Sequence, residues 1–169
     1  MKTLLLMRHG KSSWDDRSLA DFERPLAQRG VKASKRIGRE LASRGWVPTR
    51  VLVSPALRTQ RTWELVAAEL AEAPTVGAVE SLYDATPDEL LAELQGADET
   101  VETLLVIGHN PGLQDLALAV ADKASDAKAL ARLGEKFPTA AVARFVVEGT
   151  WQGLSEARLT DFLRPKDLV

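Results

Sequence analysis

Three short apolar segments most constrain how this chain can fold. They cover residues 2–7, 50–53 and 103–107, and each is apolar along its length rather than at alternate positions. Continuous apolar strands are typical of a parallel sheet that is covered on both faces. Segments with helical periodicity lie between them, and strands that alternate with helices form mainly parallel sheets. The sequence therefore predicts an α/β fold, a three-layer α/β/α sandwich with a mainly parallel central sheet.

Helix signals lie between and after these segments. Pro25 suits the first turn of a basic amphipathic helix that runs to about Arg44, and Gly45 suits its end. Ser54 and Pro55 have the residue types of an N-cap and a first helical residue. Helices are also expected over 90–94, behind a capping box that begins at Thr86, and over 113–121, with further strands over 141–147 and 157–162.

Length and composition exclude several classes of protein. A chain of 169 residues is long enough for one domain, which we expect to span residues 1–169. Its net charge of −2 gives no general attraction to nucleic acids or acidic membranes. The chain has no cysteine and two histidines, His9 and His109, so neither a metal site nor a cofactor is expected. Without a segment that resembles a membrane span or a signal peptide, we expect a cytoplasmic protein. We also expect a monomer.

Polar residues follow each of the three apolar segments. Arg8 and His9 follow the first, Ser54 follows the second with Arg58 just beyond it, and His109 follows the third. The carboxyl ends of parallel strands border the ligand crevice of open α/β sheets, so we expect these side chains to meet there. Two guanidiniums and two imidazoles at one edge would repel one another without an anion. A dianionic phosphoryl group fits them, because arginine binds it with two parallel hydrogen bonds.

Each of these residues also has an ordinary structural explanation. A histidine at a strand end is often a surface or hydrogen-bonded core residue, and His109 lies in a turn-rich segment with Asn110, Pro111 and Gly112. Arg58 is harder to explain, because a cation in the first turn of a helix opposes the helix dipole. A bound anion shared by the guanidinium and the helix N-terminus would remove that conflict.

Three motifs give the chain a resemblance to a known family. R-H-G follows the first apolar segment, S-P-x-x-R-T-x-x-T the second and G-H-N-P-G the third, in the order found in the histidine phosphatase superfamily. R-H-G-K-S-S-W, D-F-E-R-P-L-x-x-R-G, S-P-A-L-R-T and F-P-T-A-A, spread over nearly the whole chain, resemble the small SixA-type phosphohistidine phosphatases. The resemblance implies a phosphoglycerate-mutase-like fold and a nucleophile, His9, that becomes phosphorylated and is then freed by water. It also implies that Arg8, Arg58 and His109 hold the phosphoryl oxygens without a metal.

The resemblance leaves the general acid open. It places Asp84, in the stretch L-Y-D, where the family often has a glutamate, with Glu80 as a weaker candidate; a solvated loop position is the alternative for Asp84. Lys11 and Arg61 stand where many relatives have a glutamate and a glutamine, and both add positive charge near the expected mouth unless they are simply exposed. The residues expected to bind substrate or border the pocket are Arg8, Lys11, Ser12, Arg24, Arg58, His109 and Thr139.

Three functions are compatible with these residues. The leading hypothesis is a metal-independent phosphatase of protein phosphohistidine, because no long insertion could form a lid and a phosphoramidate needs less help from an acid than an alkyl phosphate. A phosphatase of small phosphomonoesters is the alternative, and it would need Asp84 as its acid. A non-catalytic module that binds phosphate or a partner is the third, although another arginine would then serve better than His9. No clamp for a second anionic group is evident, which disfavours a mutase, and the expected partner is a phosphorylated protein or a small phosphomonoester rather than nucleic acid or a membrane.

Overall fold

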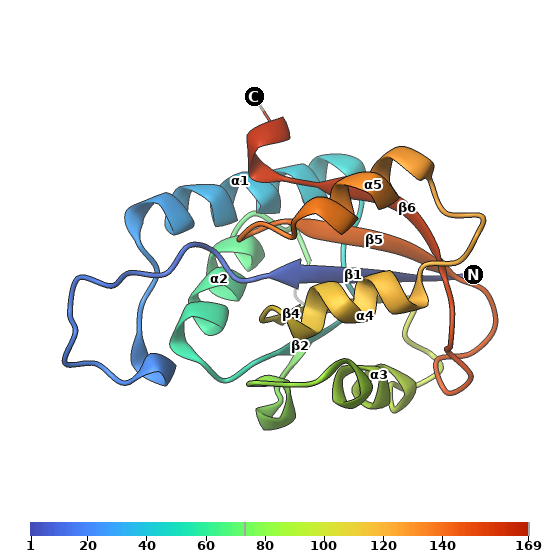
Figure 1. Ribbon diagram of the computed structural model, residues 1–169, viewed down its shortest axis with the longest axis horizontal. Coiled ribbons are helices and arrows are strands. Elements are labelled where there is room, and N and C mark those ends of the chain that lie inside the picture. Colours follow the sequence, from blue (N-terminus) through green and yellow to red (C-terminus); the bar gives the residue numbers. More distant parts are fainter. Residues whose placement is uncertain (73, 169) are drawn as a thin grey trace.

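Six strands form one sheet in the residues that the computed structural model describes, 1–72 and 74–168. They are β1 (Lys2–Arg8), β2 (Arg50–Val53), β3 (Thr75–Ala78), β4 (Thr103–Gly108), β5 (Val142–Val147) and β6 (Arg158–Leu163). Their order across the sheet is β3-β2-β4-β1-β5-β6 (Figure 1). The four strands from β3 to β1 are parallel, whereas β5 runs antiparallel to both β1 and β6. The mainly parallel sheet is therefore confirmed.

Helices cover both faces of this sheet (Figure 1). They are α1 (Gln28–Arg44), α2 (Leu57–Ala67), α3 (Pro87–Gln95), α4 (Gly112–Val120), α5 (Ala127–Glu135) and the 3-10 helices η1 (Asp21–Glu23), η2 (Glu80–Leu82) and η3 (Pro165–Asp167). α1 and α2 pack on one face, and α3, α4 and α5 pack on the other, which confirms the three-layer α/β/α architecture. Within the described ranges, no helix has both the length and the hydropathy needed to cross a membrane.

The packing of β1 explains why the buried strands are apolar at every position. Leu4 and Leu6 enter the core beside α3, α4 and α5, whereas Leu5 and Met7 enter the core beneath α1 and α2. All four side chains are fully buried. Because helices cover both faces, neither set of alternate side chains can be polar without losing hydration.

α1 begins later than the sequence predicts. It starts at Gln28 rather than at Pro25. The Ser13 amide donates to the Pro25 carbonyl oxygen at 2.8 Å, and the Ala27 amide donates to the Lys11 carbonyl oxygen at 2.9 Å. This tertiary pairing keeps the segment before Gln28 extended against the loop that follows β1, and it outweighs the preference of proline for a helical first turn.

Other predicted boundaries are confirmed. Gly45 ends α1 in the left-handed conformation, with φ of 70°. At the start of α3, the Thr86 hydroxyl accepts from the Glu89 amide at 3.2 Å, while the Glu89 carboxylate accepts from the Thr86 amide at 3.1 Å, as a capping box requires. The bounds of α4, β5 and β6 differ from the predicted ranges by one residue at most.

Candidate active site

The structure brings together the four residues predicted at the strand ends. Arg8 is the last residue of β1 and His9 follows it, while His109 follows β4 and Arg58 is the second residue of α2. In the parallel register, Arg8 lies opposite Gly108, so the two histidines leave the sheet side by side. Their ring centroids are 5.1 Å apart, and Nη2 of Arg58 lies 3.4 Å from Nδ1 of His109. A compact cluster of cations and imidazoles therefore occupies the carboxyl edge of the sheet.

His9 is held in one tautomer. Its Nδ1 lies 2.7 Å from the Gly10 carbonyl oxygen, which can only accept, so Nδ1 carries the proton and Nε2 presents a lone pair. The side chain is buried, with 7 % of the residue exposed. Burial lowers the pKa of His9 to about 3, and the charges of His109, Arg58 and Arg8 act in the same direction. At neutral pH, His9 is therefore a neutral imidazole with a free nucleophilic nitrogen.

Hydrogen bonds and close packing fix the loop that carries His9. The Gly10 amide donates to Thr62 Oγ1 at 3.0 Å, and the Thr62 hydroxyl donates to the Arg58 carbonyl oxygen at 2.7 Å. Gly30 of α1 lies so close that a Cβ there would overlap the Lys11 carbonyl oxygen and stand 2.7 Å from the Lys11 nitrogen. α1 and α2 thus hold the loop from both sides.

This packing predicts opposite effects for two glycine substitutions. Gly30→Ala should destabilise the protein by about 1–3 kcal/mol, because its methyl group would collide with backbone that cannot move aside locally. Gly134→Ala is the control, since a Cβ at that helical position meets nothing within 4 Å and should stabilise α5 by about 0.5 kcal/mol. Urea denaturation measures both free energies of unfolding. Equal stability of the Gly30→Ala variant and the wild type would contradict the tight contact between α1 and the loop.

His109 is held in the other tautomer. Arg58 Nη2 can only donate to Nδ1, so Nε2 carries the proton and donates to Ser54 Oγ at 2.7 Å. Burial and the charge of Arg58 lower the pKa of His109 to about 4, against the opposing effect of Asp21. The prediction that Ser54 caps the following helix is wrong: Ala56 is the N-cap of α2, and the Ser54 hydroxyl orients His109 instead.

The two buried histidines predict a dependence of stability on pH. Their pKa values, about 3 for His9 and about 4 for His109, lie below the value of about 6.5 for an unfolded chain. The unfolded state therefore binds more protons as the pH falls, and the free energy of unfolding should decrease from about pH 6.5 downward, by roughly 2 kcal/mol for His9 alone at pH 5. Urea denaturation at neutral and acidic pH measures the decrease. In a His9→Gln variant, the free energy of unfolding should decrease less at acidic pH. A decrease as large as that of the wild type would contradict the low pKa of His9.

The guanidiniums of Arg8 and Arg58 add positive charge to the same edge. Arg8 Nη1 donates to the Phe137 carbonyl oxygen at 3.0 Å. The Nε atoms of Arg8 and Arg58 are both buried without a hydrogen-bond partner among the described residues. Burial, and then the charge of Arg58, lower the pKa of Arg8. Arg8 nevertheless stays protonated, as arginine does in proteins. Two guanidiniums at one edge of the sheet favour an anionic ligand with several oxygen atoms.

Asp21 is a site residue that sequence reasoning missed. Its Oδ2 accepts from Arg58 Nη2 at 3.0 Å and from the Tyr83 hydroxyl at 2.6 Å, while Oδ1 accepts from Arg24 Nη2 at 3.0 Å. The Asp21 carbonyl oxygen also accepts from Arg58 Nη1 at 2.7 Å. The Tyr83 hydrogen bond, followed by those of the arginines, holds the pKa of Asp21 well below its usual range. Asp21 therefore stays ionised and fixes the direction of the Arg58 guanidinium.

Comparison with known proteins assigns the family. A family model described as the histidine phosphatase superfamily (branch 1) matches residues 4–85, which include His9, Arg58 and Asp84. An uncharacterized protein of Mycobacterium tuberculosis is 38% identical over 146 residues, which cover 86% of this chain and 89% of the relative. The chain belongs to the histidine phosphatase superfamily. Membership supports phosphatase activity.

Solved structures connect this histidine phosphatase with the SixA-type members of the family. A provisionally assigned phosphohistidine phosphatase SixA from Nakamurella multipartitia is 29% identical, with a TM-score of 0.81 over 97% of this chain and 96% of the other. The provisionally assigned SixA of Agrobacterium tumefaciens is 25% identical, with a TM-score of 0.83 over 97% and 98% of the two chains. The SixA-type resemblance found in the sequence is therefore confirmed.

The other predicted substrate-binding residues of this histidine phosphatase lie in different surroundings. Arg24 is buried, donates to Ser12 Oγ at 2.7 Å, and places its guanidinium 3.5 Å from the centroid of the Trp14 ring. Arg24 and Ser12 thus brace the loop that presents Asp21. Lys11 is exposed and lines a hollow together with Thr139, next to the four central residues rather than among them.

Arg61 and the two candidate acids also lie at the surface. Arg61 is exposed and forms an ion pair with Glu64 in the next turn of α2. Asp84 is exposed and has a left-handed backbone, with φ of 54°. Its charge helps to raise the pKa of Tyr83, after the larger effects of the Asp21 hydrogen bond and of burial, and the Tyr83 ring packs edge-on against His109 with centroids 5.5 Å apart. Asp84 therefore stands one residue from a side chain that touches the cluster, whereas Glu80 is an exposed residue of η2.

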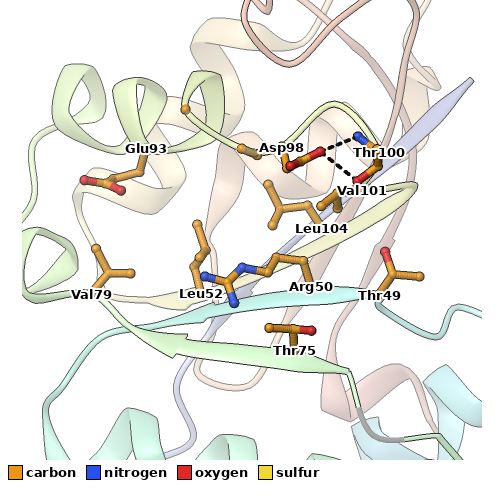
Figure 2. A pocket seen from close by; sticks show the side chains of 12 residues that line it. Thr49, Arg50, Leu52, Thr75, Val79, Glu93, Asp98, Thr100, Val101 and Leu104 are labelled. Atoms are coloured by element: carbon orange, nitrogen blue, oxygen red, sulfur yellow. Dashed lines mark hydrogen bonds between the residues drawn. The ribbon is translucent and has the colours of Figure 1, made fainter.

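A separate hollow of about 600 Å³ lies at the opposite edge of the sheet (Figure 2). It is bordered by Thr49 and Thr75 near the amino ends of β2 and β3, and by Asp98, whose carboxylate accepts from Thr100 at 2.7 and 2.8 Å. None of the motif residues borders it. Among the described residues of the whole chain, no group of three or more His, Cys, Asp or Glu side chains is placed to hold a metal ion.

Proposed function

We propose that this protein is a metal-independent phosphatase that carries the phosphoryl group on Nε2 of His9 and acts on phosphohistidine in a protein. The tautomer of His9 is the observation that carries the proposal. A neutral imidazole with its Nε2 lone pair free is a nucleophile, and the positive charges of Arg8 and Arg58 near it suit the phosphoryl oxygens. These two arginines supply the positive charge that a metal ion supplies in other phosphoryl-transfer enzymes.

The reaction has two balanced steps. In the first, the lone pair of His9 Nε2 attacks phosphorus, the P–N bond of the substrate breaks, and the leaving imidazole takes up a proton. His109 helps to orient the Arg58 guanidinium, because its Nδ1 accepts from Arg58 Nη2. In the second, water attacks the phosphorus of the phosphorylated His9, the new P–N bond breaks, and inorganic phosphate leaves.

Three exposed apolar side chains support a macromolecular substrate. Trp14, Phe22 and Leu57 are 63 %, 41 % and 38 % exposed. Phe22 belongs to η1 and packs edge-on against the Tyr83 ring, and Leu57 directly precedes Arg58. Apolar side chains exposed around a phosphate site favour contact with a protein surface. The SixA-type relatives, which are provisionally assigned as phosphohistidine phosphatases, support the same substrate class.

The alternative functions make different demands on the site. A phosphatase of small phosphomonoesters needs an acid for the alkoxide, and the exposed Asp84 beside Tyr83 is the observation that favours it. A module that only binds phosphate would gain from a further positive charge beside Arg8 and Arg58. The buried, neutral His9 supplies none, so its environment favours catalysis over binding alone.

A trapping experiment tests the proposal. A phosphohistidine peptide labelled on phosphorus is mixed with the protein in the presence of EDTA, quenched at short times, and the labelled residue is mapped. We expect hydrolysis at an unchanged rate in EDTA and transient label on His9 alone. Label on another residue, a strict requirement for metal, or failure to hydrolyse any phosphohistidine while phosphomonoesters are turned over would each overturn the proposal.

A further inference from the structure

A positively charged hollow adjoins the candidate active site. Its volume is about 200 Å³, and no acidic residue is among the described residues that line it. The chain as a whole has a net charge of −2, so this concentration of positive charge is local. The cationic residues of the lining are Lys11, Arg29, Lys136, Arg164 and Lys166.

Two backbone segments connect the hollow with the site. Lys11 lies two residues after His9, which places their Cα atoms within about 7.6 Å of each other. Thr139 lines the hollow, and the next residue, Ala140, donates its amide hydrogen to the His9 carbonyl oxygen at 3.0 Å. On the other side of Thr139, the Phe137 carbonyl oxygen holds Arg8. A ligand that fills the hollow therefore lies beside the backbone that carries and contacts His9.

The hollow continues along α1. A second hollow, of about 520 Å³, shares Arg29 and Lys166 with the first and adds Lys32 and Arg36. The C-terminal segment runs beside α1 (Figure 1), and residues of both line the two hollows. We call the two together the basic groove, and its cationic residues are Lys11, Arg29, Lys32, Arg36, Lys136, Arg164 and Lys166.

Most of these cations have no acidic partner among the residues that the structure describes. Arg164 pairs with Asp167 at 2.8 Å, and Arg36 donates to the Leu168 carbonyl oxygen at 3.2 Å. In the described part of the chain, no carboxylate lies within 4.0 Å of the charged groups of Lys11, Arg29, Lys32, Lys136 or Lys166. A row of like charges destabilises the free protein and strengthens the binding of an anionic partner.

We propose that the basic groove binds an acidic segment of the phosphorylated protein and so directs its phosphohistidine to His9. This inference rests on the proposed function, and it further specifies that the phosphorylated partner carries an acidic segment. The groove runs from the loop that follows His9 along α1, which suits a chain with several carboxylates better than a single small anion. No aromatic side chain lines it, so it lacks the stacking surface with which proteins bind single-stranded nucleic acid.

Binding of an unphosphorylated peptide tests the groove without catalysis. The probe is a labelled ten-residue peptide of Asp, Glu, Gly and Ser, and its match has Asn and Gln in place of the acids. We expect the wild type to bind the acidic peptide, with an affinity that falls as salt rises, and the Arg29→Glu/Lys32→Glu variant to bind about tenfold more weakly. The control is Lys123→Glu/Lys128→Glu, which makes the same charge change at exposed lysines outside the groove and should bind as the wild type does. Thermal melts verify that both variants fold.

Kinetics separate this inference from the proposed function. Phosphoimidazole and two phosphohistidine peptides, one with acidic and one with neutral flanks, are compared as substrates. The Arg29→Glu/Lys32→Glu variant should raise KM about tenfold for the acidic peptide alone and leave the hydrolysis of phosphoimidazole unchanged. The inference would be overturned if the wild type had equal KM values for both peptides. It would also be overturned if the groove bound an oligonucleotide more tightly than the acidic peptide. Either result would leave the proposed function intact. If the wild type bound the acidic peptide but hydrolysed no phosphohistidine substrate, the proposed function would be overturned instead.

Discussion

Replacing His9 by alanine should abolish both turnover and the phosphoenzyme, with kcat reduced on the order of 10⁴-fold or more. In the proposed mechanism the Nε2 lone pair is the nucleophile, because Nδ1 is committed to the Gly10 carbonyl oxygen and the other imidazole of the cluster, His109, has its lone pair facing Arg58. Water alone would have to attack the substrate in the variant. Steady-state hydrolysis of a phosphohistidine peptide and acid-free trapping of the phosphoenzyme measure the two losses.

The matched control is His109→Ala. This substitution removes a ring of the same size from the same edge, so it tests whether any disturbance of the cluster gives the same result. It should slow both half-reactions but still allow label to accumulate on His9, because the nucleophile is retained. A His9→Ala protein that folds normally and turns over at the wild-type rate would show that another residue is the nucleophile.

The strand ends were predictable from the sequence because two simple rules act there. A segment that is apolar at every position must be covered on both faces, and the carboxyl ends of parallel strands meet at one edge. Arg8, His9 and His109 are the first polar side chains after two such segments, and the β1–β4 register places them together. Short-range information was sufficient for this part of the site.

The remainder of the site depends on contacts that no local pattern contains. Asp21 meets Arg58 across 37 residues of sequence and Tyr83 across 62, so nothing near Asp21 marks it as their common partner. Ser54 has the residue type of an N-cap, yet its hydroxyl is used by His109, 55 residues away. Tertiary hydrogen bonds replaced the local ones that the sequence favours.

Two elements of the fold were missed for related reasons. β3 is a four-residue edge strand with mostly exposed side chains, and its Gly77 leaves space for the Arg50 guanidinium, so it lacks the apolar signal of a buried strand. α5 buries Ala129 and Leu133 but ends in Gly134 and Glu135 and follows a turn-rich segment. Weak patterns of this kind become stable only when the sheet and its other helices are already in place.

Asp84→Asn should separate two classes of substrate. If Asp84 is the general acid, hydrolysis of a phosphomonoester should fall by about 100- to 10,000-fold, because an alkoxide leaves poorly without a proton. Hydrolysis of a phosphohistidine peptide should change little, since the leaving imidazole nitrogen can take its proton from solvent. Asparagine tolerates the left-handed backbone found at this position, so the substitution removes the acid without straining the chain. Rates on both substrates over a range of pH measure the difference.

The position of Asp84 decides what each outcome means. The residue is exposed next to Tyr83, whose ring packs on His109, so an acid there would reach a leaving group at the mouth rather than the buried phosphoryl group. Asp88→Asn is the control, because it makes the same chemical change at an exposed residue in the first turn of α3. Equal and small losses on both substrates would assign Asp84 to the solvated loop. A severe loss on both would show instead that the phosphoramidate also needs a positioned proton. Asp84 would then protonate the leaving group of both substrates.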